Sequence, residues 1–401
     1  MKRLALATFF CLIAASPALA QRSFDTFLRD FEATAVAAGI TADVYRAATR
    51  GLTEDSSVPE RVEAQPEFET AVWDYLDRRI TDQRIANGQR AYEANRDLFA
   101  RVGREFGVDP YVLAAIWGIE SDFGAVLDNP VYVKPVIRSL ASLVFHERGR
   151  VEADARELIA ALRIIQMGDA TAETLLGSWA GAIGHLQLIP TAFLEHAIDY
   201  DGDGRRDPHR SLADALASSA QYLRDLGYTP GQDWGYEVSV PEGFDYALAG
   251  REQLRPLSFF ADRGVRRVRD RAFRDLGEQV FLYAPAGRNG PKFLMTSNYL
   301  VFKGYNFSDS YALTVGHLAD RLRGSPEFAA SWPRNARFLN REERIELQTL
   351  LVRAGYLRGP VEGRLGPITS AALRDWQAAN GLVADGFATI EALEALRRAA
   401  R

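Results

Sequence analysis

Residues 109–124 read Asp-Pro-Tyr-Val-Leu-Ala-Ala-Ile-Trp-Gly-Ile-Glu-Ser-Asp-Phe-Gly, and this stretch predicts a buried helix that ends in an acid. Asp109 is a typical N-cap residue, and Pro110 suits the first helical position, so the start of the helix is well marked. The run from Tyr111 to Ile119 is apolar on every face. A helix of this kind is expected inside a protein core.

Glu120 follows on the same face as Leu113 and Trp117, and its side chain is expected to lean back over the preceding turn. A carboxyl group held there loses hydration, which raises its pKa toward the range that a general acid needs. Glu120 is therefore our candidate catalytic acid. The alternative is that Glu120 only ends the helix and reaches water.

The first twenty residues have the pattern of a secretory signal. Lys2 and Arg3 are followed by an apolar run over residues 4–15 and by Ala18-Leu19-Ala20, a small-residue cleavage pattern. The run is too short to span a membrane as a helix. We therefore expect residues 1–20 to be removed on export to the periplasm.

Composition limits what the mature chain can do. The single cysteine, Cys11, lies inside the signal, so the mature chain has no thiol for a disulfide or for thiolate chemistry. The formal charge is −5 for the whole chain, and the loss of Lys2 and Arg3 brings it to −7. An acidic protein repels phosphate, so we expect no nucleic-acid partner. No later segment has a membrane-spanning length.

Periodicity along the chain predicts a mainly helical (α+β) protein. Helical patterns run from Phe24 to Phe106, Glu152 to Met167 and Leu212 to Leu226. Between Val238 and Gly304 alternating and aromatic runs separated by glycines predict a small antiparallel sheet. Helix returns at Asp309–Arg323. Glycine and proline residues that follow mark a boundary, so we predict domains at 21–325 and 339–401 with a linker at 326–338.

Residues 199–204, Asp-Tyr-Asp-Gly-Asp-Gly, have the spacing of a calcium loop. Asp199, Asp201 and Asp203 stand at positions 1, 3 and 5, and a glycine stands at position 6. Carboxylates crowded in this way repel one another unless a cation lies between them. Helical patterns at 191–198 and 212–226 flank the loop, which is therefore EF-hand-like. Position 12 is Arg210, where a bidentate Glu would be expected.

Three motifs, in the same order, resemble the lytic murein transglycosylase B family, lysozyme-like enzymes that cleave peptidoglycan. They are the stretch around Glu120, the segment 177–190 and the loop 199–204, and the resemblance extends from about Phe24 to about Arg323. It implies a lysozyme-like catalytic domain with the small sheet and the calcium loop predicted above.

The last segment, 339–401, predicts a compact helical module of about sixty residues, near the lower size limit for a self-supporting core. It resembles the peptidoglycan-binding type 1 domain, a three-helix module. The matching motifs include Gly355-Tyr356, Gly366-Pro367-Ile368-Thr369, Trp376-Gln377 and Asp385-Gly386. A module that cleaves and a module that binds the same polymer make sense together.

Cleavage of a glycosidic bond needs a proton donor and a group that stabilises the oxocarbenium-like centre. No second carboxylate at helical spacing partners Glu120, because Asp122 lies two positions on and points away. In substrate-assisted glycosidases a group on the sugar replaces that carboxylate, and N-acetylmuramic acid carries an acetamido group. The resemblance implies that one glutamate protonates the bond and then deprotonates the sugar's 6-hydroxyl, which yields a 1,6-anhydro product.

The resemblance also implies that four further residues line the sugar cleft. Ser178 and Gln187 match positions that place the acetamido group, and Asn306 and Tyr311 match further cleft positions. His185 and Leu186 stand where the family would have an aromatic or a small residue, which leaves the subsite preference open. The glycines around Ser178 suit close approach of a sugar ring, or equally tight packing against a helix. They are Gly177, Gly181 and Gly184.

For the metal loop, the resemblance implies closure by an aspartate further along, which here is Asp214, with Asp207 as the competing ligand. Arg205 would contribute its backbone oxygen. We expect a structural Ca²⁺ and no organic cofactor.

Two other functions remain open from the sequence. A lysozyme-type hydrolase would use the same Glu120 and let water resolve the intermediate. A non-catalytic wall-binding protein would need only the carboxy-terminal module. The expected partner is peptidoglycan in each case, and protein partners are unknown.

Overall fold

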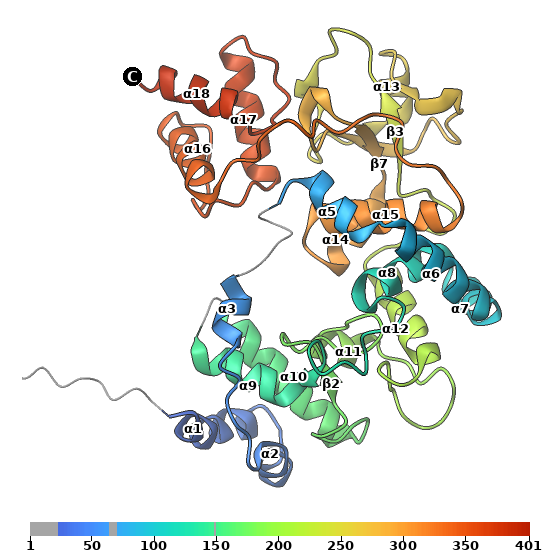
Figure 1. Ribbon diagram of the computed structural model, residues 1–401, viewed down its shortest axis with the longest axis vertical. Coiled ribbons are helices and arrows are strands. Elements are labelled where there is room, and N and C mark those ends of the chain that lie inside the picture. Colours follow the sequence, from blue (N-terminus) through green and yellow to red (C-terminus); the bar gives the residue numbers. More distant parts are fainter. Residues whose placement is uncertain (1–22, 64–69, 148–149) are drawn as a thin grey trace, which may run out of the picture.

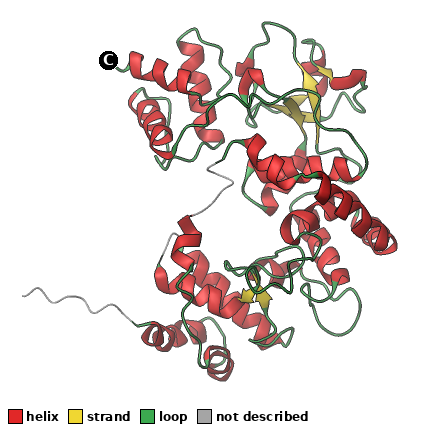
Figure 2. Cartoon of the chain, viewed as in Figure 1, coloured by secondary structure: helices red, strands yellow, loops and turns green. Residues whose placement is uncertain are grey.

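The computed structural model describes residues 23–63, 70–147 and 150–401 (Figures 1 and 2). The predicted signal peptide lies outside these residues. Helices dominate the described parts of the chain, and a small sheet lies at one end, as Figure 2 shows. None of the helices described is long and apolar enough to cross a membrane.

One group of helices forms the lower part of the molecule in Figure 1. Their shared apolar core includes Phe27, Leu140 and Leu162. The helix α1 is capped at its start by the Ser23 hydroxyl, which accepts from the amide of Thr26. The members of the group are α1 (Phe24–Ala37), α2 (Ala42–Thr49), α3 (Val58–Glu63), α9 (Val136–His146), α10 (Val151–Met167) and α11 (Pro190–His196).

The helix α8 (Pro110–Ser121) is the centre of a second group. Residues 112–119 are all buried, as their continuous apolar run predicts. The most extensive contact of α8 is with α15 (Asp309–Leu322), a helix that lies far from it in the sequence. The helices α6 (Asp82–Ala94), α7 (Arg96–Phe106) and α12 (Leu212–Asp225) also contact α8, and α5 (Val72–Arg79) contacts α15.

The predicted antiparallel sheet is present, with the strand order β4-β6-β7-β3-β5. In the register of its central pair, Phe281 lies opposite Met295 and Tyr283 opposite Phe293. One expectation was wrong in detail. The range predicted as sheet ends in a helix, α14 (Ser297–Tyr305), whose start is capped by Thr296. The strands are β3 (Gly235–Ser239), β4 (Arg255–Pro256), β5 (Arg266–Arg267), β6 (Gln279–Tyr283) and β7 (Lys292–Met295).

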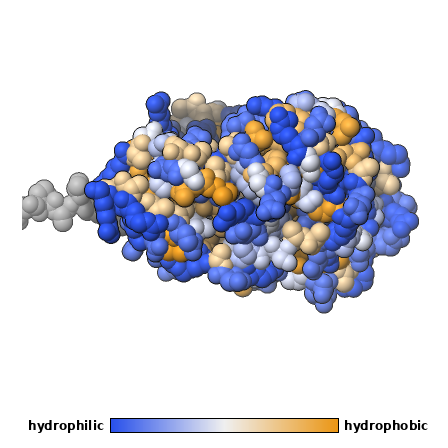
Figure 3. Space-filling view, turned by 90° about the horizontal axis from the view of Figure 1, so that it is seen from above, coloured by the Kyte–Doolittle hydropathy of each residue, from blue (hydrophilic) through white to orange (hydrophobic). Residues whose placement is uncertain are grey.

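The last three helices pack around their own apolar core, which includes Leu347, Leu373 and Trp376. They are α16 (Arg341–Arg353), α17 (Pro367–Ala379) and α18 (Ile390–Ala399). In Figure 1 this group lies beside the sheet, at the upper left. Seen from above, this end of the molecule is mostly hydrophilic with smaller apolar areas between (Figure 3).

The carboxy-terminal module is docked against the rest of the chain through an apolar cluster. Trp73, at the start of α5, lies 6.4 Å from the ring of Phe387 of the module and 6.2 Å from Trp332 of the connecting segment. Ala71 and Ala286 complete the buried part of this cluster. The module therefore shares an interface with both α5 and the sheet.

Candidate active site

Glu120 lies in the last turn of α8, and its position follows from the two ends of that helix. The Asp109 carboxylate accepts from the amide of Tyr111 at 2.9 Å, and Pro110 fills the first helical position. Asp122 ends the helix in the left-handed conformation, with φ of 51°. Glu120 is half-buried. The carboxyl group therefore stands at the rim of the core, in contact with both protein and solvent.

Tyr311 of α15 donates a hydrogen bond of 2.6 Å from its hydroxyl to Oε1 of Glu120. Its side chain is buried. Burial, and then the nearby charge of Glu120, raise the pKa of Tyr311 well above its usual value. The phenol therefore keeps its proton at neutral pH and acts as a donor to the carboxylate. The structure thus brings together two of the residues that the sequence assigned to one cleft.

Tyr305, at the end of α14, is a second tyrosine near Glu120. Burial and the charge of Glu120 also raise the pKa of Tyr305. Its hydroxyl donates to the carbonyl oxygen of Leu186 at 2.7 Å and lies 2.9 Å from the hydroxyl of Ser219. Sequence reasoning did not single out Tyr305, although it directly precedes Asn306. These contacts connect the 177–190 segment to α14 and α12.

A second link to that segment comes from α8 itself. Trp117, one helical turn before Glu120, donates from Nε1 to Nδ1 of His185 at 3.0 Å. Burial lowers the pKa of His185 to about 4, so the ring is neutral and can accept this hydrogen bond. The sequence left the role of His185 open, and this contact with Trp117 gives it a structural role.

Gln187 lies beside these two links and has a strained backbone. Its φ is 52°, in the left-handed region, and its Nε2 donates to the carbonyl of Gly184 at 2.9 Å. At Gly184 a Cβ atom would come within 2.1 Å of the Pro208 carbonyl oxygen. Tight packing is therefore a sufficient reason for glycine there, whether or not a sugar also approaches.

The side chains of Ser178 and Asn306 each accept hydrogen bonds from backbone amides of their own turn. The hydroxyl of Ser178 accepts from the amides of Ala180 and Ala182, so its hydrogen bonds lie within its own turn. Asn306 accepts from the amide of Ser308 at 3.2 Å, and Ser308 caps the helix that begins just before Tyr311. Asn306 therefore lies close along the chain to Tyr311.

Asp122, two positions after Glu120, is bound to a neighbouring helix. Its Oδ1 accepts from Nε of Arg84 on α6 at 3.2 Å. This ion pair is between half-buried groups and ties the end of α8 to α6.

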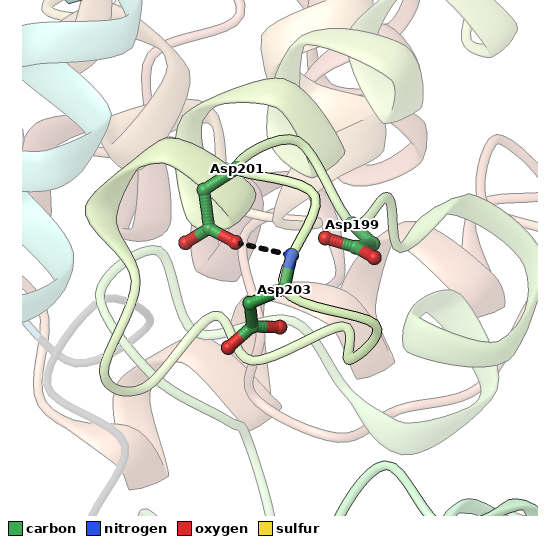
Figure 4. A group of neighbouring side chains, drawn as sticks. All are labelled: Asp199, Asp201 and Asp203. Carbon is green, nitrogen blue, oxygen red and sulfur yellow. Dashed lines mark hydrogen bonds between the residues drawn. The ribbon is translucent and has the colours of Figure 1, made fainter.

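The aspartates of the predicted metal loop lie close together (Figure 4). Asp199, Asp201 and Asp203 each offer one oxygen within 4.8 Å of the others. Several of these oxygens also accept hydrogen bonds from amides of the loop, and both oxygens of Asp199 do so. For example, the amide of Asp203 donates to Oδ1 of Asp201 at 3.2 Å, as Figure 4 shows. A set of carboxylate oxygens at this spacing suits a hard cation such as Ca²⁺.

Asp214 and Asp207 have different roles in the loop. Asp214 is buried, and its carboxylate accepts from the backbone amides of Tyr200, Asp201 and Asp207. Burial raises the pKa of Asp214 above its usual value. Asp207 accepts from the amides of the two residues after Pro208. Neither belongs to the three-aspartate group among the described residues.

Arg205 is exposed, and its amide donates to Oδ1 of Asp203 at 2.9 Å. Its carbonyl oxygen remains a predicted ligand.

Comparisons with known proteins now identify the chain. The family model described as a transglycosylase SLT domain matches residues 23–320, nearly three quarters of the chain. The chain belongs to the transglycosylase SLT family. In this transglycosylase a second model, described as a peptidoglycan binding domain, matches residues 340–396.

Relatives of this transglycosylase agree with the assignment. SltB3 from Pseudomonas aeruginosa, whose crystal structure was solved in complex with NAG-anhNAM-pentapeptide, is 41% identical in sequence to this chain. The structural match covers 94% of this chain and 100% of the SltB3 chain, with a TM-score of 0.87. Membrane-bound lytic murein transglycosylase B of Escherichia coli (strain K12) is 26% identical over 67% of this chain and 72% of its own length. The structure of Escherichia coli Slt35 in complex with calcium, 22% identical over 74% of this chain and 92% of its own with a TM-score of 0.62, shares the fold.

Proposed function

We propose that this protein is a lytic transglycosylase that cleaves the β-1,4 bond between N-acetylmuramic acid and N-acetylglucosamine in peptidoglycan and leaves a 1,6-anhydro end. The observation that carries the proposal is the half-buried Glu120 carboxyl, held by the hydroxyl of Tyr311 in a chain of the transglycosylase SLT family. SltB3, a relative of known structure, was solved in complex with NAG-anhNAM-pentapeptide.

Glu120 performs two proton transfers in this reaction. It first gives its proton to the glycosidic oxygen, and the bond from that oxygen to C1 of the muramic acid breaks. The acetamido group of the same sugar stabilises the developing positive charge at C1. The Glu120 carboxylate then takes the proton of the 6-hydroxyl, and O6 bonds to C1. Glu120 ends in its starting protonation state, and no water is consumed.

Tyr311 and Tyr305 serve this cycle by holding the carboxyl group and its surroundings in place. The Tyr311 hydroxyl orients Oε1 of Glu120. Tyr305 holds the Leu186 carbonyl, and therefore the loop that carries Gln187. We propose that Ser178, Gln187 and Asn306 contact the sugar. No substrate is needed to position their backbones, since each is already fixed by hydrogen bonds to its own turn.

The test is digestion of purified sacculi, followed by mass spectrometry of the soluble fragments. A transglycosylase releases fragments lighter by one water molecule than those of a hydrolase. Reducing ends in place of anhydro ends would show a lysozyme-type hydrolase. No soluble fragments, with retained binding to sacculi, would show a wall-binding protein without catalysis.

We further propose that Asp199, Asp201 and Asp203 bind a structural Ca²⁺, with the carbonyl oxygen of Arg205 as a further ligand and Asp214 or Asp207 closing the loop. The three-aspartate group supports this proposal. The ion would join α11 and α12 across the loop, so its role would be to stabilise the fold.

The proposed place of action is the periplasm, after removal of residues 1–20, with residues 21–325 as the catalytic domain, 326–338 as the linker and 339–401 as the wall-binding module. Cell fractionation with a carboxy-terminal tag tests the location, and amino-terminal sequencing of the exported protein tests the cleavage site.

A further inference from the structure

One short segment of this acidic chain concentrates positive charge. Residues 262–275 contain six arginines and three aspartates, whereas the chain as a whole has a formal charge of −5. None of these arginines takes part in the proposed cleavage reaction. The six are Arg263, Arg266, Arg267, Arg269, Arg271 and Arg274.

A cavity of about 230 Å³ lies against this segment. Its walls are the β3 strand, the second half of α15 and residues 325–328, and four of the six arginines complete the lining. Stretches that are distant in the sequence thus converge on one space. Since a water molecule occupies about 30 Å³, the space holds a tetrahedral oxyanion with several water molecules. The four arginines are Arg267, Arg269, Arg271 and Arg274.

Arg267 of β5 is half-buried and fixed in place without an acidic partner. Its Nη1 donates to the carbonyl oxygen of Ala272 at 3.1 Å, and its guanidinium carbon lies 4.8 Å from the centre of the Tyr236 ring. It forms no ion pair with any residue that the structure describes. Its Nε is buried and has no hydrogen-bond partner among those residues. A buried polar group left in this way calls for a ligand or an ion nearby.

Two further arginines lie close to Arg267. Burial, and then the charge of Arg271, lower the pKa of Arg267, and Arg274 acts in the same direction. Arg271 is exposed and makes no hydrogen bond or ion pair within the described parts of the chain. Arg274 has a long ion pair, 3.6 Å, with Asp233. One carboxylate therefore stands against three guanidinium groups, which repel one another unless an anion lies between them.

The other acids on the cavity wall have partners of their own. The two oxygens of Glu237 accept from the backbone amides of residues 329 and 330, each at 2.8 Å. Asp320 accepts from Nε1 of Trp234 at 3.0 Å. The side chain of Glu327 is 82% exposed. These acids therefore leave the excess of positive charge around Arg267 uncompensated.

The backbone that carries the arginines is strained. Arg269 and Asp270 have φ of 58° and 51°, in the left-handed region that side chains rarely adopt. The turn brings Ala272 back against Arg267, and Arg269 donates to the carbonyl oxygen of Glu327 at 2.7 Å. Strain of this kind is concentrated at sites that hold a ligand. The turn is thus fastened to both sides of the cavity.

We propose that this cavity binds a phosphate-type oxyanion between Arg267, Arg271 and Arg274. A guanidinium group presents parallel N–H donors that match two oxygens of a phosphate. A phosphate offers more oxygens and more negative charge than a carboxylate, which suits three convergent arginines. The ligand is either free phosphate or the phosphate of a lipid headgroup, since both present the same chemistry. The proposal does not depend on the cleavage reaction at Glu120.

Calorimetric titration of the full chain with inorganic phosphate, in calcium-free buffer at constant ionic strength, tests the site. Wild-type protein should bind phosphate saturably at one site. Arg271→Gln should weaken binding about tenfold, because it removes charge-assisted hydrogen bonds. The variant should keep the wild-type melting temperature, since Arg271 has no contact to lose within the described chain.

Arg263→Gln is the matched control. It makes the same change of charge in the same segment, but Arg263 does not line the cavity. Its dissociation constant for phosphate should equal that of wild type. If wild-type protein does not bind phosphate, the proposal is overturned. Equal weakening by the two variants also overturns it, because the segment would then attract anions only through its overall charge.

A second measurement separates the two sources of the phosphate group. The protein is sedimented with phosphatidylcholine vesicles that contain or lack phosphatidylglycerol, with and without inorganic phosphate. If the ligand is a lipid headgroup, wild-type protein should sediment with the phosphatidylglycerol vesicles, and saturating phosphate should release it. If the ligand is free phosphate, calorimetric binding should occur without sedimentation. Sedimentation that phosphate does not reverse, and that both variants reduce equally, contradicts the proposed site.

Discussion

Tyr311 and Glu120 lie 191 positions apart in the chain, yet their side chains are joined by a hydrogen bond of 2.6 Å. Each comes from a helix whose buried face packs against the other, α8 against α15. The distance between the acid and its donor is therefore set by the packing of two core helices. Elements of this kind hold a reacting group more firmly than a loop does.

The first prediction concerns the acid. Glu120→Gln keeps the size and an acceptor oxygen for Tyr311 but cannot exchange a proton, so kcat should fall by about 10³-fold or more. The melting temperature should stay within a few degrees of wild type. The measurement is release of soluble fragments from sacculi, and Glu242→Gln, an exposed residue, is the control. Substantial cleavage by the Glu120 variant would exclude it as the catalytic acid.

The second prediction concerns the donor. Tyr311→Phe removes the hydrogen bond to Glu120, a loss of about 0.5–1.5 kcal/mol while the carboxyl is protonated and about 1.5–3 kcal/mol once it is a carboxylate. We expect kcat to fall by about 10- to 100-fold with little change in KM, because the hydroxyl orients the acid and the ring still fills the core. Steady-state kinetics on a soluble oligomer measures this. Tyr132→Phe, at an exposed position, should behave as wild type. An unchanged kcat for Tyr311→Phe means that the hydroxyl has no positioning role.

The third prediction concerns calcium. Chelator-treated protein should gain about 2.7 kcal/mol when Ca²⁺ is added at about 100 times its dissociation constant. The melting temperature should rise accordingly, and Asp203→Ala should abolish the rise. Asp97→Ala, an exposed change in α7, should retain it. If Ca²⁺ leaves the melting temperature of the wild type unchanged, the loop does not bind the ion.

The fourth prediction concerns docking of the module. Gly287→Ala should loosen it, because the added methyl group meets Asp385. We expect faster proteolysis within the 324–340 segment. Gly243→Ala controls for backbone strain, since Gly243 has φ of 73° and no atom within 4 Å of its Cβ position. Similar cleavage rates for the two variants would show that strain, and not the contact with Asp385, is responsible.

The fifth prediction concerns pH. Burial lowers the pKa of His317 to about 3, from about 6.5 in the unfolded chain. Below pH 6.5 the unfolded state therefore binds more protons, so stability falls as the pH falls. At pH 5 the loss is about 2 kcal/mol for this group.

Replacement of His317 by Phe removes this titration. It keeps the stacking on Phe328, since the centroids of the two rings lie 3.7 Å apart. Between pH 7.5 and 5 the melting temperature of His317→Phe should therefore fall less than that of wild type. The titration of Asp320 has the opposite effect on stability. Burial raises the pKa of this carboxyl to about 6, so its contribution to stability increases as the pH falls. Comparison with the variant cancels that contribution. Parallel pH curves for the two proteins would contradict the assignment.

Much of the fold follows from local pattern. The apolar run of 111–119 with its Asp-Pro start predicts α8. The α14 helix was missed, because its aromatic residues also suit a strand and its identity is decided by packing against α12 and α15. Periodicity alone does not separate short apolar helices from strands.

For the candidate site, sequence reasoning identified the residues but not their contacts. Glu120 and Tyr311 were assigned separately, and only the fold brings them together. Tyr305 was missed because its role is to hold the Leu186 carbonyl, a backbone group that leaves no trace in a motif. The three aspartates were found because their ligand spacing is local in the chain.

The interface around Trp73 has a mechanical consequence. A wall-binding module on a flexible linker would bind a strand independently of the catalytic domain. This module is docked, so its distance from the bond to be cleaved is constant. Capture and cleavage then become one event on one stretch of polymer. To move to a neighbouring strand, the catalytic domain and the module must dissociate from the first strand together.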